Sequence, residues 1–145
     1  LPGNGPWQLG NSRIEPLPFM ALDDYDQLLW QCDINFVRGE DSFVRAQWAG
    51  QPFIWQIYRQ EEDAHLIKLS AFLERYCATM LEQDARAITN MFVAWNGAES
   101  SVADAWAAFL AHWEGIGRYS RAWSRKMAME SDLATRLVNF CAARV

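Results

Sequence analysis

The sequence predicts an α/β fold, with a short parallel sheet in its first half and helices throughout its second half. Two observations support this prediction. Residues 13–58 alternate short apolar runs with short helical patterns, whereas the apolar residues after position 60 follow only helical spacing. Strand, helix, strand, helix, strand at this spacing is typical of parallel βαβ units with right-handed crossovers.

Three strands are expected in the first half. Residues 13–17 (RIEPL) form the first, and Pro16 confines it to an edge of the sheet or ends it. Residues 33–37 (DINFV) form the second, and residues 52–58 (PFIWQIY), rich in β-branched and aromatic side chains, form the third. The Gly- and Pro-rich residues 1–12 are expected to be a linker or loop.

Two helices connect these strands. Residues 23–31 begin with aspartates, which suit a helix N-terminus, and their apolar side chains fall on one face. Residues 42–50 (SFVRAQWAG) are expected to begin with Ser42 as the capping residue and to end at Gly50.

Four helices are expected in the second half, over residues 61–81, 84–95, 101–113 and 119–143. The first begins with three acidic residues, which complement the dipole of a helix N-terminus. Each helix has a stripe of large apolar side chains, many of them aromatic. Such stripes indicate packing into a core rather than a cofactor site.

Composition argues against several classes of function. The 145 residues include 13 Lys+Arg and 18 Asp+Glu, a net charge of −5, so no basic surface for nucleic acid is expected. Every apolar run is interrupted by charge well short of the ~20 residues of a membrane span. Cys32, Cys77 and Cys141 form no C-x-x-C pair, which indicates free thiols in a reducing cytoplasm. His65 and His112 have no partner at zinc-ligand spacing, so no metal site is expected.

Aromatic and polar residues follow all three expected strands. Phe19 and Tyr25 follow the first, and the segment VRGEDSF spans the end of the second. Tyr58, Arg59 and Gln60 lie at the end of the third. Because the carboxyl ends of parallel strands lie at one edge of a sheet, where ligands bind, these residues are expected to converge. Phe19 and Tyr25 can hold a flat base between their rings or pack in the core.

The segment VRGEDSF has the most specific pattern. Gly39 permits a tight turn, and Ser42 can cap the next helix while its first amides face a diphosphate. Arg38 can add a positive charge, and Glu40 can accept hydrogen bonds from sugar hydroxyls. Asp41 would repel a phosphate, so it is expected to have a structural role, to cap amides or to hold a donor. A plain strand–turn–helix with acidic residues at the helix start explains the same spacing.

The stretch CDINFVRGEDSFVRAQWAG, within residues 19–69, closely resembles the protein-arginine rhamnosyltransferase family (EarP), bacterial enzymes that modify translation elongation factor P. The resemblance implies a two-domain GT-B glycosyltransferase, of which residues 1–145 are the Rossmann-like, C-terminal, donor-binding half. The opening Leu in place of Met also suggests a piece of a longer protein. Such enzymes transfer L-rhamnose from TDP-rhamnose to an arginine, with inversion and without a metal or cofactor.

The resemblance also implies roles for residues that match the family pattern: Phe19, Tyr25, Arg38, Glu40, Asp41, Ser42, Tyr58 and Gln60. In the family, the first two aromatic positions hold the thymine base. Residues matching Glu40, Asp41 and Ser42 contact the phosphates and the sugar or support catalysis. The aromatic residue at the position of Tyr58 lies near the diphosphate.

Two positions depart from that pattern. Leu22 stands where the family has Gln, and leucine offers no amide to a base edge, which puts base selectivity in question. Arg59 stands where the family commonly has Pro, in the loop after Tyr58.

The family takes its general base, an aspartate, from the N-terminal domain, which also supplies the acceptor surface. We therefore expect the isolated chain to bind donor weakly, to catalyse nothing alone and to require its own N-terminal domain as a partner. The alternative is a non-catalytic α/β module that binds a nucleotide or another protein. Comparing TDP with UDP binding separates a specific donor site from a degraded one.

Overall fold

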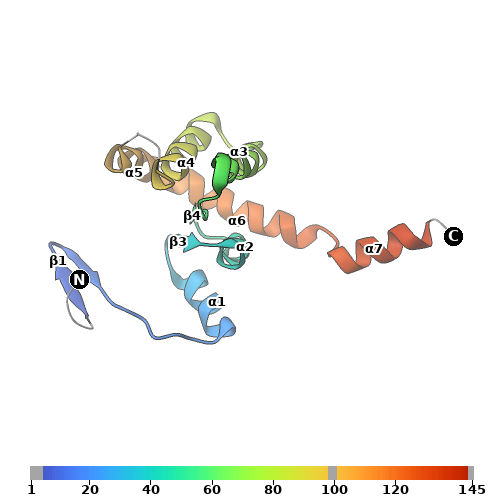
Figure 1. Ribbon diagram of the computed structural model, residues 1–145, viewed down its shortest axis with the longest axis horizontal. Helices are drawn as coiled ribbons and strands as arrows, with labels where there is room; N and C mark the ends of the chain where they lie inside the picture. The colour runs from blue at the N-terminus through green and yellow to red at the C-terminus, as the bar shows by residue number, and fades with distance from the viewer. Residues whose placement is uncertain (1–4, 98–100, 144–145) are drawn as a thin grey trace.

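The computed structural model describes residues 5–97 and 101–143 (Figure 1). Its elements follow in this order: β1 (Trp7–Leu9), β2 (Ser12–Ile14), α1 (Leu22–Gln31), β3 (Asn35–Arg38), α2 (Glu40–Ala49), β4 (Phe53–Gln56), the 3-10 turn η1 (Glu61–Asp63), α3 (Ala64–Cys77), α4 (Glu82–Trp95), α5 (Val102–Ala111), α6 (Trp113–Met129) and α7 (Leu133–Ala142).

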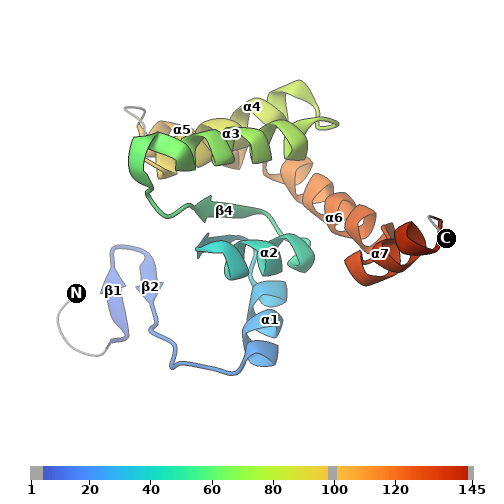
Figure 2. The ribbon, with the colours of Figure 1, turned by 45° about the vertical axis from the view of Figure 1, so that its right-hand side comes forward.

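The centre of the molecule is a short parallel sheet. β3 and β4 pair in parallel, with Asn35 opposite Phe53 and Arg38 opposite Gln56. α2 packs against both strands, α1 packs against α2, and α4 packs against β4. Figure 2 shows the sheet between α1 and α2 on one side and the helices of the second half on the other. The expected mixed α/β fold, a short parallel sheet followed by helices, is confirmed.

The first expected strand does not join this sheet. β2 ends at Ile14 and pairs antiparallel with β1, in a hairpin that stands to one side of the body (Figure 1). Pro16 and Pro18 follow at once, and neither has the backbone N–H that a sheet ladder requires. The prediction of three parallel strands is therefore wrong. Trp7–Leu9 is a strand where a loop was expected, and residues 1–4 lie outside the described chain.

Several helix starts also differ from expectation: α4 begins at Glu82 instead of residue 84, and α6 begins at Trp113 instead of residue 119. α2 begins at Glu40 with Gly39 as its N-cap, so Ser42 is the third residue of the helix and not its cap. The helix expected from residue 61 begins only at Ala64, because Glu62 and Asp63 have φ near +54° and +55°, outside the helical region.

The helices expected to run to residues 81 and 143 are shorter in the structure. α3 ends at Cys77. The last expected helix is divided into two helices, because α6 ends at Met129 and α7 begins at Leu133. α7 has its own N-cap, Asp132, whose carboxylate accepts a hydrogen bond from the Thr135 backbone N–H at 2.9 Å.

The core joins the two halves through aromatic side chains. Phe53 of β4, Tyr76 of α3 and Phe92 of α4 are each at most 1% exposed. The ring of Phe53 lies 5.6 Å from that of Tyr76 and 5.8 Å from that of Phe92. Burying each such side chain contributes about 1.5–3 kcal/mol, so the helical half holds the sheet in place.

Tyr76 makes the stability of this core sensitive to high pH. Burial raises the pKa of its hydroxyl above the ordinary value of 10, and the hydrogen bond with Ser120 at 3.1 Å opposes this only in part. Above pH 10 the unfolded chain therefore loses the Tyr76 proton before the folded chain does. The free energy of unfolding should fall by about 1 kcal/mol per pH unit from this residue.

Denaturant unfolding between pH 8 and 11 tests this dependence. The fall in the free energy of unfolding should be smaller by about 1 kcal/mol per pH unit in Tyr76→Phe. It should be as in the wild type in Tyr58→Phe, because Tyr58 is exposed. Identical pH curves for the wild type and Tyr76→Phe would contradict it.

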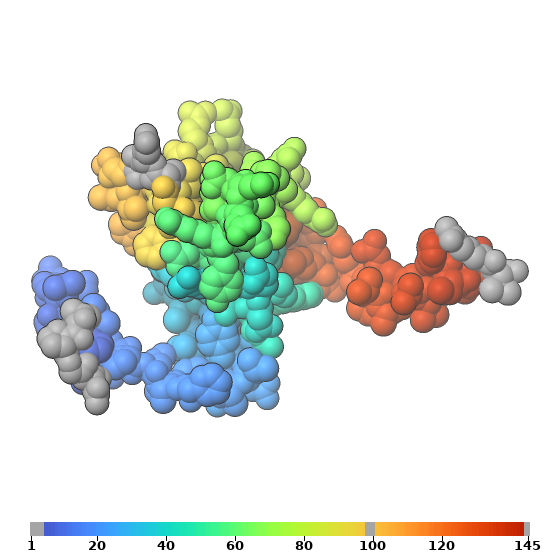
Figure 3. Space-filling view, viewed as in Figure 1, coloured from blue at the N-terminus to red at the C-terminus, as the bar shows by residue number. Residues whose placement is uncertain are grey.

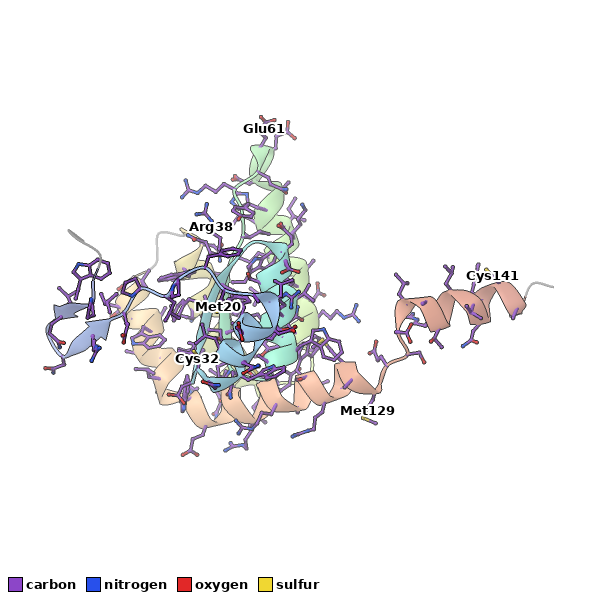
Figure 4. The ribbon with its side chains drawn as sticks, turned by 90° about the horizontal axis from the view of Figure 1, so that it is seen from below. Met20, Cys32, Arg38, Glu61, Met129 and Cys141 are labelled. Carbon is purple, nitrogen blue, oxygen red and sulfur yellow. The ribbon has the colours of Figure 1, made fainter. Side chains whose placement is uncertain are left out.

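The C-terminal helix projects from the body. Every residue of α7 is exposed, and Figure 3 shows it at the end of the arm that α6 begins. Met129 and Cys141 mark this arm in Figure 4. Cys32, Cys77 and Cys141 are free thiols. Within the described residues, no helix is long and apolar enough to cross a membrane, and no cluster of three or more His, Cys, Asp or Glu side chains is placed to hold a metal.

Candidate functional site

The carboxyl end of β3 and the first turn of α2 bring the VRGEDSF residues together. Gly39 is the N-cap of α2, with φ 81° and ψ 176°, a conformation open essentially only to glycine. It has no side chain to bond the first amides of the helix. The backbone N–H groups of residues 40–42 therefore have no partner within the helix and form its positive end.

Tyr58 lies directly over this turn. It follows β4 by two residues and is 47% exposed. A Cβ atom on Gly39 would lie 3.0 Å from a Tyr58 ring carbon and 3.2 Å from its hydroxyl oxygen. The guanidinium carbon of Arg38, labelled in Figure 4, is 4.9 Å from the centre of the Tyr58 ring, a cation–π distance. We call Arg38, Gly39, residues 40–42 and Tyr58 the β3–α2 site.

Two residues that the sequence did not point to hold the backbone of the β3–α2 site through hydrogen bonds. The indole N–H of the buried Trp55 donates to the Gly39 carbonyl at 3.0 Å. The Asn96 side chain accepts from the Ile57 backbone N–H at 3.0 Å and donates to the Trp55 carbonyl at 2.8 Å. The end of α4 thus holds the end of β4 that leads to Tyr58. In the sequence, Asn96 is an ordinary residue for the C-terminus of a helix, so no local pattern reveals its hydrogen bonds to β4.

Asp41 is bound to an arginine. The Arg45 Nε–H donates to an Asp41 carboxylate oxygen at 2.8 Å, and Arg45 Nη1 donates to both carboxylate oxygens of Asp26 on α1, at 3.0 and 2.8 Å. The hydrogen bonds with Asp41 and Asp26 raise the pKa of Arg45. Asp41 therefore holds a donor, which is one of the roles expected for it. The spacing of Asp41 and Arg45, four residues apart on a helix, is the sequence signal for their pair.

Phe19 and Tyr25 do not meet. Phe19 is fully exposed on the extended segment between β2 and α1, whereas Tyr25 is half-buried on α1 and packs against the core. No ring contact joins the two in the part of the chain that the structure describes. Leu22 is the first residue of α1 and is 58% exposed.

Gln60 faces a different part of the molecule. Its side-chain oxygen accepts from Lys68 Nζ at 2.8 Å, and its backbone N–H donates to His65 Nδ1 at 3.3 Å. It lines a cavity of about 790 Å³ formed with α3 and α4. No residue of the β3–α2 site lines that cavity. The structure thus separates Gln60 from the other expected residues.

The β3–α2 site combines a helix N-terminus, a guanidinium, an exposed aromatic ring and the carboxylate of Glu40. The first two attract an anion, and helix amides in this position suit the oxygens of a phosphate. The ring can cover an apolar face of a ligand, and the carboxylate can accept hydrogen bonds from hydroxyl groups. This set of groups fits a phosphorylated sugar.

Comparisons with known proteins identify the family of the chain. A model of the family described as elongation-factor P (EF-P) rhamnosyltransferase EarP matches residues 3–142. A protein-arginine rhamnosyltransferase of Pseudomonas aeruginosa is 53% identical over 130 residues, which cover 90% of this chain and 34% of the relative. A protein-arginine rhamnosyltransferase of Pseudomonas putida is 45% identical over 144 residues, which cover 95% of this chain and 38% of the relative. One from Neisseria meningitidis is 36% identical over 138 residues, which cover 92% of this chain and 36% of the relative.

A solved structure described as the structural basis for EarP-mediated arginine glycosylation of translation elongation factor EF-P superimposes on this chain with a TM-score of 0.78 at 39% sequence identity. The match covers 97% of this chain and 46% of that one. The chain spans about a third of the length of the curated relatives that it matches. The match of the family model over nearly the whole chain, together with these relatives, shows that the chain belongs to the EarP family of EF-P rhamnosyltransferases.

Proposed function

We propose that residues 1–145 form the donor-binding domain of a cytoplasmic protein-arginine rhamnosyltransferase with a Rossmann-like, GT-B architecture. The donor is TDP-rhamnose, and the acceptor is an arginine of elongation factor P. The observation that supports this most is the N-terminus of α2 with no side-chain cap, which lies beside the stacked side chains of Arg38 and Tyr58 in a chain of the EarP family.

Each part of the β3–α2 site has a role in this proposal. The N–H groups of residues 40–42 bind the diphosphate, and Arg38 neutralises a second phosphate oxygen. Tyr58 covers the diphosphate, and Glu40, which is exposed, accepts from rhamnose hydroxyls.

The thymine base and Gln60 require rearrangement. Phe19 reaches the base beside Tyr25 only if the extended segment before α1 folds back. Gln60 reaches the donor only if its side chain leaves Lys68, with which it makes a 2.8 Å hydrogen bond.

The reaction forms a bond between a guanidinium nitrogen and the anomeric carbon of rhamnose, breaks the bond from that carbon to the diphosphate oxygen, and releases TDP. Helix amides and Arg38 stabilise the negative charge that develops on the leaving diphosphate. The arginine acceptor is normally protonated, so a carboxylate base is needed as well. In this proposal an aspartate of the enzyme's own N-terminal domain supplies it, and the isolated chain binds donor without transferring rhamnose.

Calorimetric titration with TDP-rhamnose tests the proposal. We expect saturable binding that is weaker for UDP and about tenfold weaker in Ser42→Ala, or about 1.4 kcal/mol, because Ser42 lies in the first turn of α2. Ser70→Ala, an exposed serine on α3, is the matched control and should bind as the wild type does. A folded chain that shows no saturable binding would contradict the proposal.

A non-catalytic nucleotide-binding module is the second candidate. The exposed Leu22 at the start of α1 favours it, because this side chain offers no hydrogen bond to a base edge. Equal affinities for TDP and UDP would support this candidate over the first.

A further inference from the structure

We propose that Arg45 is a positioning residue of the donor site, which couples its base-binding side to its diphosphate-binding side. The inference rests on the proposed function, because it concerns the same site. Arg45 itself touches no donor group in this proposal. It acts through the two carboxylates that it binds.

The geometry places one guanidinium between two helices. Asp26 follows Tyr25 on α1, and Asp41 is the second residue of α2. The side chains of Arg45 and Asp26 are only 24% and 29% exposed, whereas that of Asp41 is 75% exposed. The planar fork of an arginine can satisfy both carboxylates at once, which an ammonium group cannot do with the same geometry.

The pair with Asp41 has an electrostatic consequence for the site. An unpaired carboxylate in the first turn of α2 would repel a diphosphate at the helix N-terminus. Arg45 lies one turn further along α2, so its hydrogen bond draws the Asp41 carboxylate toward the middle of the helix and offsets part of its charge. The open amides of residues 40–42 are then left to the anion.

The pair with Asp26 has a geometric consequence. Two hydrogen bonds, at 3.0 and 2.8 Å, fix α1 against α2 beside Tyr25. Tyr25 is the aromatic residue proposed for the base, so the distance between the base and the diphosphate subsites depends on this contact. Another helical pair, Glu82 with Arg86 on α4, is exposed at 86% and 70% and joins a single helix to itself.

The test is a double-mutant cycle on the 145-residue chain, followed by calorimetric titration with TDP-rhamnose. Arg45→Met should weaken binding about tenfold, because it frees the Asp41 charge. Adding Asp41→Asn to Arg45→Met should restore at least about threefold, because it removes that charge. Asp41→Asn alone should change binding by less than about twofold, because Arg45 already pairs with that carboxylate. Arg86→Met is the matched control and should bind within about twofold of the wild type.

A purely structural role of Arg45 predicts that Asp41→Asn changes binding by the same factor with and without Arg45→Met, because lost packing and lost charge then act independently. If the double variant binds no more tightly than Arg45→Met, or if Arg45→Met binds as the wild type does, this inference is overturned while the proposed function stands. Absence of TDP-rhamnose binding by the folded wild type overturns both.

Asp26→Asn provides a second test that leaves the Arg45–Asp41 pair in place. It should weaken binding of TDP-rhamnose several-fold but leave the affinity for inorganic pyrophosphate, which has no base, unchanged. Equal loss for the two ligands would overturn the coupling between the subsites.

Discussion

Replacing Gly39 with alanine is expected to lower the free energy of unfolding by about 3 kcal/mol and to weaken TDP-rhamnose binding more than about tenfold. The φ of 81° at Gly39 is strained for any residue with a Cβ atom, and that atom would lie 3.0 Å from the Tyr58 ring. Either Tyr58 moves away from the N-terminus of α2, or the turn between β3 and α2 changes. Both results disturb the proposed diphosphate site.

Urea unfolding and calorimetric titration measure the two effects. Gly10→Ala is the matched control, because Gly10 also has a positive φ, +60°, but has no atom within 4 Å of the added Cβ. Gly10→Ala should lower the free energy of unfolding by about 1 kcal/mol and leave donor binding unchanged. Donor affinity in Gly39→Ala equal to that of the wild type would contradict the role assigned to this turn.

Replacing Asn96 with alanine is expected to lower the free energy of unfolding by about 2–3 kcal/mol. The Asn96 side chain bonds the Ile57 N–H and the carbonyls of Trp55 and Phe92, at 2.8–3.0 Å. Its loss leaves polar groups of β4 without a partner in a largely buried region. Because β4 leads to Tyr58, donor binding should weaken as well.

Asn90→Ala is the control, since Asn90 is an exposed residue of the same helix. It should change the free energy of unfolding by less than about 0.5 kcal/mol. Thermal unfolding of both variants, followed by circular dichroism, makes the comparison. Similar losses in the two would mean that the bonds from Asn96 to β4 do not stabilise the fold.

The local parts of the fold could be predicted from the sequence. The parallel pair around residues 35–56 and the helix between its strands follow from apolar runs and from glycines at their ends, and the structure confirms them. For the strand expected over residues 13–17, the predicted pairing with the parallel sheet was wrong. The prolines after Ile14 mark its end, but only the full structure shows that it pairs with β1 instead of the sheet.

The residues of the candidate site divide in the same way. The pattern VRGEDSF indicated Arg38, Gly39 and the first turn of α2, since strand, turn and helix are local events. Ser42 was expected to cap that helix, but Gly39 occupies the cap position. A sequence pattern does not fix the first residue of a helix to within a few positions. Trp55 and Asn96 could not be predicted, because their bonds join residues 16 to 41 positions apart.

The sequence by itself determined the fold class, the order of the central elements and the family, because apolar periodicity, glycines and a long specific stretch are properties of neighbouring residues. Only the tertiary structure decided that Tyr58 covers Gly39, that Arg45 joins α1 to α2, and that Gln60 faces α3 and α4 instead of the β3–α2 site. These contacts depend on how helices pack across the sheet. Packing is set by the shapes of side chains far apart in the chain, and no local pattern encodes it.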